Sequence, residues 1–148
     1  MKKVRLEYSN SRDKNIIGIV CQKPDYWLVL QLNKHLDIHL IRQKDIPVYQ
    51  ERLQVNVPFH FFSCVNNWEQ NIFFFKNYSS ISTLFTKYKN FDYFLILDNA
   101  IPVEESIANI RKINEVNAVL SFPIDSIPKI EYFLEDLEFH ILEINKGL

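Results

Sequence analysis

The chain contains only two glycines, Gly18 and Gly147, among its 148 residues. Loops that wrap a phosphate group with backbone N–H groups need several residues without a Cβ atom, as in the GxxxxGK[ST] and GxGxxG patterns. Two glycines so far apart in the sequence cannot supply either pattern. The sequence therefore excludes nucleotide-binding domains of the P-loop and Rossmann types.

Size and charge predict one globular domain over residues 1–148. Hydrophobic residues make up 47% of the chain, which is enough to bury a core without disulfides or metal ions. The 17 basic and 18 acidic residues leave a net charge of −1, so the dense positive charge of DNA-coating proteins is absent. We therefore expect no DNA partner.

The expected compartment is the cytoplasm. The longest apolar runs, such as residues 16–21 and 91–97, are far shorter than the roughly 20 residues that cross a bilayer. Residues 1–7 carry charge, but no apolar segment follows them, so they do not form a signal peptide. Cys21 and Cys64 lie in separate apolar runs and are expected to be reduced, buried thiols. We predict no membrane partner.

Alternating and β-branched apolar residues predict strands along the whole chain. Val4, Leu6 and Tyr8 alternate with charged residues, as in a half-buried strand. Residues 15–21 are apolar on both faces, which is typical of a central strand, and we expect this strand to pair with the first. Further strands are predicted over residues 38–43, 91–98, 116–122 and 139–144.

Three other segments have helical spacing. Pro24 and Asp25 open the first helix, in which Leu28, Leu32 and Leu36 form one apolar stripe. The other two helices are predicted over residues 103–113 and, after a Ser126 cap, over residues 127–137.

A β-hairpin rich in aromatic residues is the clearest local pattern. Apolar residues alternate over residues 55–65, Asn66 and Asn67 supply a turn, and residues 72–78 form the second arm. Pro58 places the first arm at a sheet edge or a bulge, because proline cannot donate a ladder hydrogen bond.

Together these elements predict an α+β fold. The expected architecture is a single domain with a mixed, mostly antiparallel sheet of about six to eight strands, an aromatic β-hairpin and about three helices on one side. Residues 43–54, which are polar and contain Pro47, are expected to be a surface connection.

The hairpin also supplies a candidate interaction surface, because aromatic side chains are enriched at the core of protein interfaces. The candidate residues are Phe62, Trp68, Phe73, Phe75 and Tyr78. Core packing is one alternative, and stacking of single-stranded RNA bases is another. RNA binding requires an exposed Phe73 or Phe75 with basic neighbours, and Lys76 is the only Lys or Arg between residues 55 and 78.

The four histidines show no metal-binding or catalytic pattern. His35 and His39 have HxxxH spacing without the acid of the HExxH motif, and the predicted helix ends between them. His60 and His140 stand alone in the sequence and are expected to be hydrogen-bonded surface residues.

The remaining chemistry-bearing residues also lack a catalytic spacing. Asp98, Glu104 and Glu105 lie at the start of a predicted helix, where acids face unpaired backbone N–H groups. No serine lies in a GxSxG or SxxK spacing. We predict no catalytic residue, no metal site and no cofactor.

The sequence INEVNAVLS, at residues 113–121, joins the second predicted helix to the following strand. Its Ile113, Glu115 and Val119 are similar to the motif of the IPExxxVDY family of bacterial proteins. The proline, aspartate and tyrosine of that motif are replaced here by asparagine, leucine and serine.

The resemblance extends to the length of the chain, the early NIIGI strand, the DYWLVLQLNKHL helix and the DYFLIL strand. No activity, cofactor or catalytic residue is assigned to that family, so the resemblance implies none for this chain. From the residues alone, Ile113 and Val119 are core positions, and Glu115 ends a helix facing solvent.

These observations favour a non-catalytic domain that binds another protein, or a second copy of itself, through the hairpin or a sheet edge. The alternative is a small-molecule-binding domain or an enzyme whose site is assembled from dispersed residues. That alternative requires a pocket in which Asp98, Glu104, His60 or His140 converge.

Overall fold

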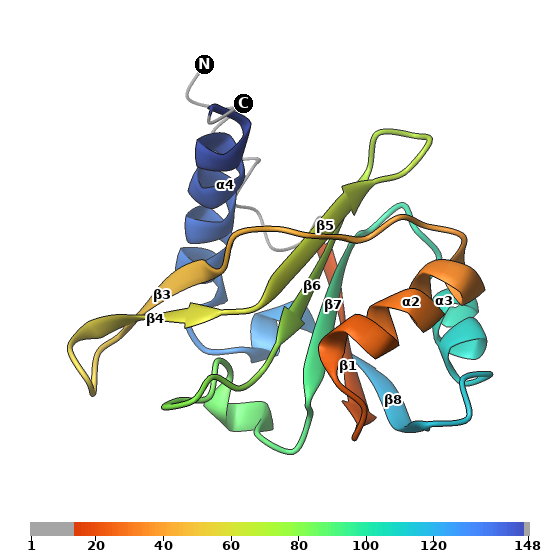
Figure 1. The fold of residues 1–148 in the computed structure, drawn as a ribbon, viewed down its shortest axis with the longest axis horizontal. Helices are drawn as coiled ribbons and strands as arrows, with labels where there is room; N and C mark the ends of the chain where they lie inside the picture. The colour runs from red at the N-terminus through yellow and green to blue at the C-terminus, as the bar shows by residue number, and fades with distance from the viewer. Residues whose placement is uncertain (1–13, 147–148) are drawn as a thin grey trace.

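The computed structural model describes residues 14–146, so the strand predicted over residues 4–8 lies outside the described residues. The elements follow one another as β1 (Lys14–Cys21), α2 (Asp25–Leu36), β2 (Ile41–Arg42), β3 (Ile46–Gln50), β4 (Val55–Phe59), β5 (Phe61–Val65), β6 (Asn71–Lys76), η2 (Thr86–Tyr88), β7 (Tyr93–Asp98), α3 (Val103–Ile110), β8 (Val116–Phe122), η3 (Ile124–Ser126) and α4 (Ile130–Lys146). Six strands form one antiparallel sheet in the order β2-β5-β6-β7-β1-β8, and β3 and β4 form a separate ribbon (Figure 1). The predicted α+β fold with a mostly antiparallel sheet is confirmed.

Strand β1 is a central strand because it is apolar on both faces. Ile16, Ile17 and Ile19 are fully buried, and β1 pairs with β7 on one side and with β8 on the other. Both sides of β1 are therefore paired within the sheet that the structure describes. Gly18 is required here, since a Cβ atom would lie 2.7 Å from a ring carbon of Phe122.

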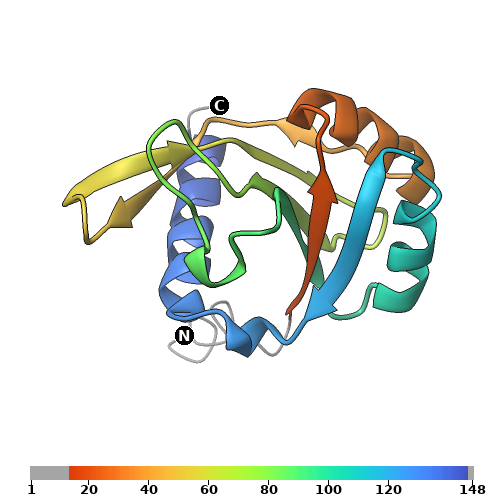
Figure 2. The ribbon, with the colours of Figure 1, turned by 90° about the horizontal axis from the view of Figure 1, so that it is seen from below.

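The sheet is covered on both faces, in contrast to the prediction that the helices share one side. Helices α2 and α3 pack on one face, and α4 packs on the other (Figure 2). Phe61, Phe73 and Phe75 face α4, whereas Phe62 and Phe74 face α2 and α3. A sheet that is apolar on both faces needs other elements packed on each face to shield it from water. This explains why α4 lies on the face opposite to α2 and α3.

The strand predicted over residues 139–144 is wrong, because these residues form the last part of α4. Leu137, Ile141 and Ile144 continue the helical spacing that begins at Phe133 and Leu134, and all five contact the core. Ser126 does not cap α4, since its hydroxyl donates to the carbonyl of Pro123 in η3 and α4 begins only at Ile130.

The surface connection predicted over residues 43–54 is also wrong, because β3 forms within it and pairs with β4. Ile46 and Val57 are buried, so the ribbon is fixed to the core at one end. Pro58 faces Pro47 in the ribbon. The predicted long arm 55–65 is thus divided at His60 into β4 and β5, whereas the hairpin of β5 with β6 is confirmed.

Candidate functional site

The five aromatic residues predicted as an interaction surface have different environments. Phe62, Phe73 and Phe75 are buried within the chain, and Tyr78 is half-buried with its hydroxyl donating to the carbonyl of Lys89. Trp68, at the tip of the hairpin, is 78% exposed. Of the five, Trp68 is therefore the residue that another molecule can reach most easily.

The buried phenylalanines form a continuous aromatic cluster. Phe75 lies 5.1 Å from Phe61 and 5.1 Å from Phe133 of α4, measured between ring centroids. Stacked and edge-on aromatic pairs at such distances stabilise a core beyond the area that they bury. Stacking of RNA bases requires an exposed Phe73 or Phe75. Both side chains are buried.

Trp68 lines a cleft of about 770 Å³ at one end of the sheet. We call it the Trp68 cleft. Its walls are the tip of the β5–β6 hairpin, the segment that follows α2, and the β7–α3 connection with the first turns of α3 (Figure 1). The polar residues that line it include Asp37, His39, Asn67, Gln70, Glu105 and Asn109.

The hairpin wall of the cleft is held by the side chain of Asn66. Its Oδ1 accepts hydrogen bonds from the backbone N–H groups of Trp68 and Gln70, each at 2.9 Å. Its Nδ2 donates to Oε1 of Gln70 at 2.7 Å. Glu69 completes the turn with a left-handed φ of 59°. These bonds fix the backbone that carries Trp68, as expected for an asparagine in a tight turn.

The opposite wall is held by a second asparagine, Asn33 of α2. Its Oδ1 accepts the backbone N–H of Leu40 at 2.8 Å, and its Nδ2 donates to the carbonyl of Leu40 at 3.3 Å. Asp37 ends the helix with a left-handed φ of 56°. Hydrogen bonds within the chain therefore fix two of the three walls, the hairpin tip and the segment that follows α2.

The charge of the cleft is acidic. Asp37 and Glu105 line it, and none of the described lining residues is Lys or Arg. Trp68 adds an aromatic ring to the same lining, and an aromatic face attracts cations. Carboxylates together with an exposed indole favour a positively charged ligand group over an anionic one.

The cleft contains one thiol, that of Cys64, and one buried hydroxyl, that of Ser106. Burial raises the pKa of the Cys64 thiol, so it stays protonated and is a weak nucleophile. The hydroxyl of Ser106 donates to the carbonyl of Pro102 at 2.8 Å. Within residues 14–146, no group of three or more His, Cys, Asp or Glu side chains is placed to hold a metal ion.

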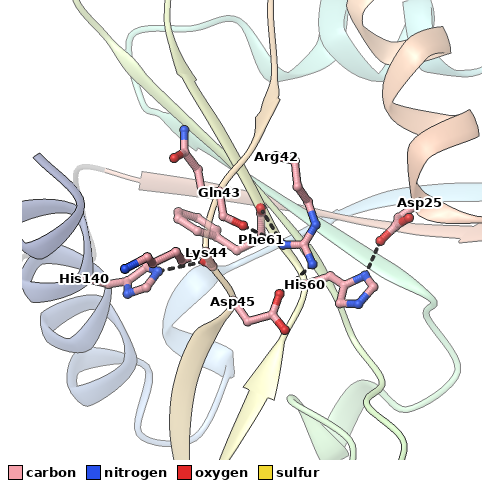
Figure 3. Close-up of polar contacts among 8 residues, drawn as sticks. All are labelled: Asp25, Arg42, Gln43, Lys44, Asp45, His60, Phe61 and His140. Carbon is pink, nitrogen blue, oxygen red and sulfur yellow. Dashed lines mark hydrogen bonds and ion pairs between the residues drawn. The ribbon is translucent and has the colours of Figure 1, made fainter. Parts of the chain in front are cut away.

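His60 is a hydrogen-bonded histidine, as the sequence predicts, and its partner is Asp25. Its Nδ1 lies 2.5 Å from Oδ2 of Asp25, the buried acid in the first turn of α2 (Figure 3). His60 follows β4, so the pair joins the N-terminus of α2 to the point where the long hairpin arm divides. Of the serines, threonines and cysteines that the structure describes, none hydrogen-bonds to the ring of His60.

The four residues of the dispersed-site hypothesis do not converge. His140 lies on α4 at the other face of the sheet, where its Nε2 is 2.9 Å from the carbonyl oxygen of Lys44 (Figure 3). Asp98 accepts the backbone N–H of Ala100 at the end of β7, and Glu104 is exposed on α3. Glu105, which lines the Trp68 cleft, is one residue away from the predicted Glu104.

No family model, no curated protein and no solved structure matches this chain. The resemblance of residues 113–121 to the IPExxxVDY motif stays a prediction. The structure buries Ile113 and Val119 and exposes Glu115, as the core pattern of that segment predicts. None of the helices within residues 14–146 is both long and apolar enough to span a bilayer.

Proposed function

We propose that this chain is a non-catalytic protein-interaction domain that binds a segment of another protein in the Trp68 cleft. The observation that carries the proposal is the exposed Trp68 on a fixed hairpin tip beside the cleft. Tryptophan is among the residues that contribute most to binding energy at interfaces. A cleft that exists before binding also lowers the entropic cost of association.

The acidic lining defines the chemistry of the partner segment. Asp37 and Glu105 favour a segment with a Lys or Arg side chain, and the indole of Trp68 can pack on its aliphatic stem or its charged head. Polar amides such as Asn67 and Gln70 can bind a peptide backbone. The expected ligand is therefore an extended, basic peptide segment.

A selection of random peptides displayed on phage, with the purified protein as target, tests this proposal. Peptides with Lys or Arg next to an apolar residue should be enriched. Trp68→Ala should weaken their binding by about 30-fold or more, which corresponds to a typical interface hot spot. Tyr132→Ala is the matched control, because Tyr132 is 67% exposed on α4, away from the cleft, and should leave affinity unchanged.

The charge contribution is tested separately. Asp37→Asn with Glu105→Gln should lower the affinity for basic peptides by about threefold to tenfold at low salt and less at high salt. Enriched peptides that bind wild type and Trp68→Ala equally would overturn the proposed site. Failure to enrich any peptide would overturn the proposed function.

A small-molecule-binding domain is the second candidate, and the size of the cleft favours it. Clefts of about 300 to 1,000 Å³ commonly hold small ligands, and the Trp68 cleft is within that range. A screen of small cationic and neutral fragments by NMR would show binding at Gln70 and Asn109 if this candidate is right. Peptide binding without fragment binding would favour the first candidate.

A further inference from the structure

Strand β8 is one edge of the six-stranded sheet. It pairs with β1 along one side, and within residues 14–146 no strand lies on its other side. An edge strand presents backbone N–H and C=O groups that a further strand can bind. β8 is seven residues long, whereas the mean strand length in globular proteins is about five to six.

Strand β8 lacks charge, proline and short length, three of the features with which proteins block an exposed edge, although it has a fourth, a β-bulge at Asn117. Its sequence, VNAVLSF, contains no charged residue, no proline and no glycine. Charged side chains, prolines and very short strands are the usual means of preventing pairing between edges. The exposed residues of β8 include Ala118 and Leu120, and Leu120 is 48% exposed.

The sequence of β8 is complementary to itself. If two copies pair in antiparallel orientation around Val119, Ala118 of one copy lies opposite Leu120 of the other, so that apolar residues face each other. Asn117 then lies opposite Ser121, which places polar residues together. No like charges meet at any position, because the strand carries none. The register of β8 against β1 shifts at Asn117, between the pairs of Val20 with Ala118 and of Cys21 with Val116, so the pair of Asn117 with Ser121 is the least regular position of this ladder.

We propose that β8 is the interface through which this chain forms a two-fold dimer, by antiparallel pairing with β8 of a second copy. Such pairing joins two six-stranded sheets into one continuous sheet and covers both open edges at once. A two-fold contact of this kind is closed, so that it ends at a dimer and does not continue into a fibre. This interface is separate from the Trp68 cleft and does not depend on it.

Light scattering with sedimentation velocity, over about 1 to 100 μM protein, tests the dimer. Wild type should form a dimer within this range. Leu120→Lys should raise the dimer dissociation constant at least tenfold, because it places two positive charges at the centre of the paired edges. Leu142→Lys makes the same change at a residue of α4 that is 57% exposed and should leave the dimer unchanged.

Circular dichroism of both variants establishes that each is folded. A wild type that stays monomeric over the whole range would overturn the proposal. So would a dimer that survives Leu120→Lys, or one that is lost in Leu142→Lys, since the second result would place the interface on α4. Trp68→Ala should keep the dimer, which separates this test from that of peptide binding.

The register of the pairing is tested with cysteines. A double variant carries both Ala118→Cys and Leu120→Cys. In the proposed register, the thiol at position 118 of one copy lies opposite the thiol at position 120 of the other, at a distance that suits a disulfide. Mild oxidation should give a covalent dimer on a non-reducing gel. In Ala118→Cys alone, the new thiol lies opposite Leu120 of the second copy, so this variant should give no covalent dimer. Equal cross-linking of the single and double variants would contradict the register.

Discussion

The two edges of the six-stranded sheet differ in how they meet solvent. At one edge, β2 is two residues long, and its Arg42 forms an ion pair with Asp45 at 2.6 Å (Figure 3). At the other edge, β8 is seven residues long and uncharged. The first edge has a short strand and charges, which block pairing, and the adjoining ribbon adds Pro47 opposite Pro58. The comparison indicates that the chain protects one edge and keeps the other suited to pairing.

The part of the sheet near β2 and the part near β8 also differ in the side chains that pack there. Beside β2, the hairpin of β5 and β6 carries the aromatic cluster around Phe75. Beside β8, Phe122 packs against Tyr88 and Phe91, and β1 contributes isoleucines and Gly18. We therefore expect substitutions in the β5–β6 hairpin to act mainly through lost aromatic packing, and a substitution of Gly18 to act through its close fit against the rings of Phe122 and Phe91.

The largest effect should come from Phe75→Ala. Phe75 is fully buried between Phe61 and Phe133, and the cavity left behind should lower the free energy of unfolding by about 3–5 kcal/mol. Urea denaturation measures the loss. Leu120→Ala on β8 removes a half-exposed side chain and should cost less than about 1 kcal/mol. A greater loss for Leu120→Ala than for Phe75→Ala would reverse the comparison.

A smaller effect is expected from Gly18→Ala. The new methyl group would lie within 3 Å of the rings of Phe122 and Phe91, so one of these rings, or the segment that carries it, must shift to receive it. We expect a loss of about 1–3 kcal/mol in unfolding free energy. Hydrogen exchange should become faster in β8 than in the β5–β6 hairpin. Equally faster hydrogen exchange in β8 and in the β5–β6 hairpin would show that these two parts of the sheet do not respond separately.

The smallest effect should come from Arg42→Ala. The ion pair with Asp45 is partly exposed, and such pairs contribute about 0–1 kcal/mol. The variant should keep the stability of wild type, as measured by thermal unfolding. It should also keep the same dimer dissociation constant, because a strand of two residues is too short to pair well even without its charge. New self-association of this variant would show that Arg42 alone protects the edge.

Local sequence patterns were sufficient to predict the elements in which apolar residues recur at a regular spacing. The stripe of Leu28, Leu32 and Leu36 predicts α2, and the alternation before Asn66 and Asn67 predicts the β5–β6 hairpin. Residues 139–144, which are apolar except for His140 and Glu143, fit either a strand or a helix over so short a distance. Their assignment to α4 depends on Phe133 and Leu134, whose stripe they continue onto the aromatic face of the sheet.

The candidate site could be predicted only in part. Trp68 is identifiable as one of the aromatic residues of the hairpin, although nothing local distinguishes it from the buried Phe73. The opposite wall of the cleft, with Asp37 and Glu105, reaches Trp68 because strand order brings distant segments to one end of the sheet. Pairing of His60 with Asp25 has the same origin. A single sequence contains no local signal for such contacts.

The position of β1 also determines the order in which the chain can fold during synthesis. β1 leaves the ribosome before every other described strand, yet its partners β7 and β8 come much later, with Lys14 pairing with Asp98 and Ile16 with Phe122. The β5–β6 hairpin can close as soon as residue 76 has been made. Until residue 122 emerges, an apolar, β-branched segment has at least one side without its partner. Translation thus creates a long interval in which β1 is without its partners, and we expect the distant pairing to slow the final step of folding.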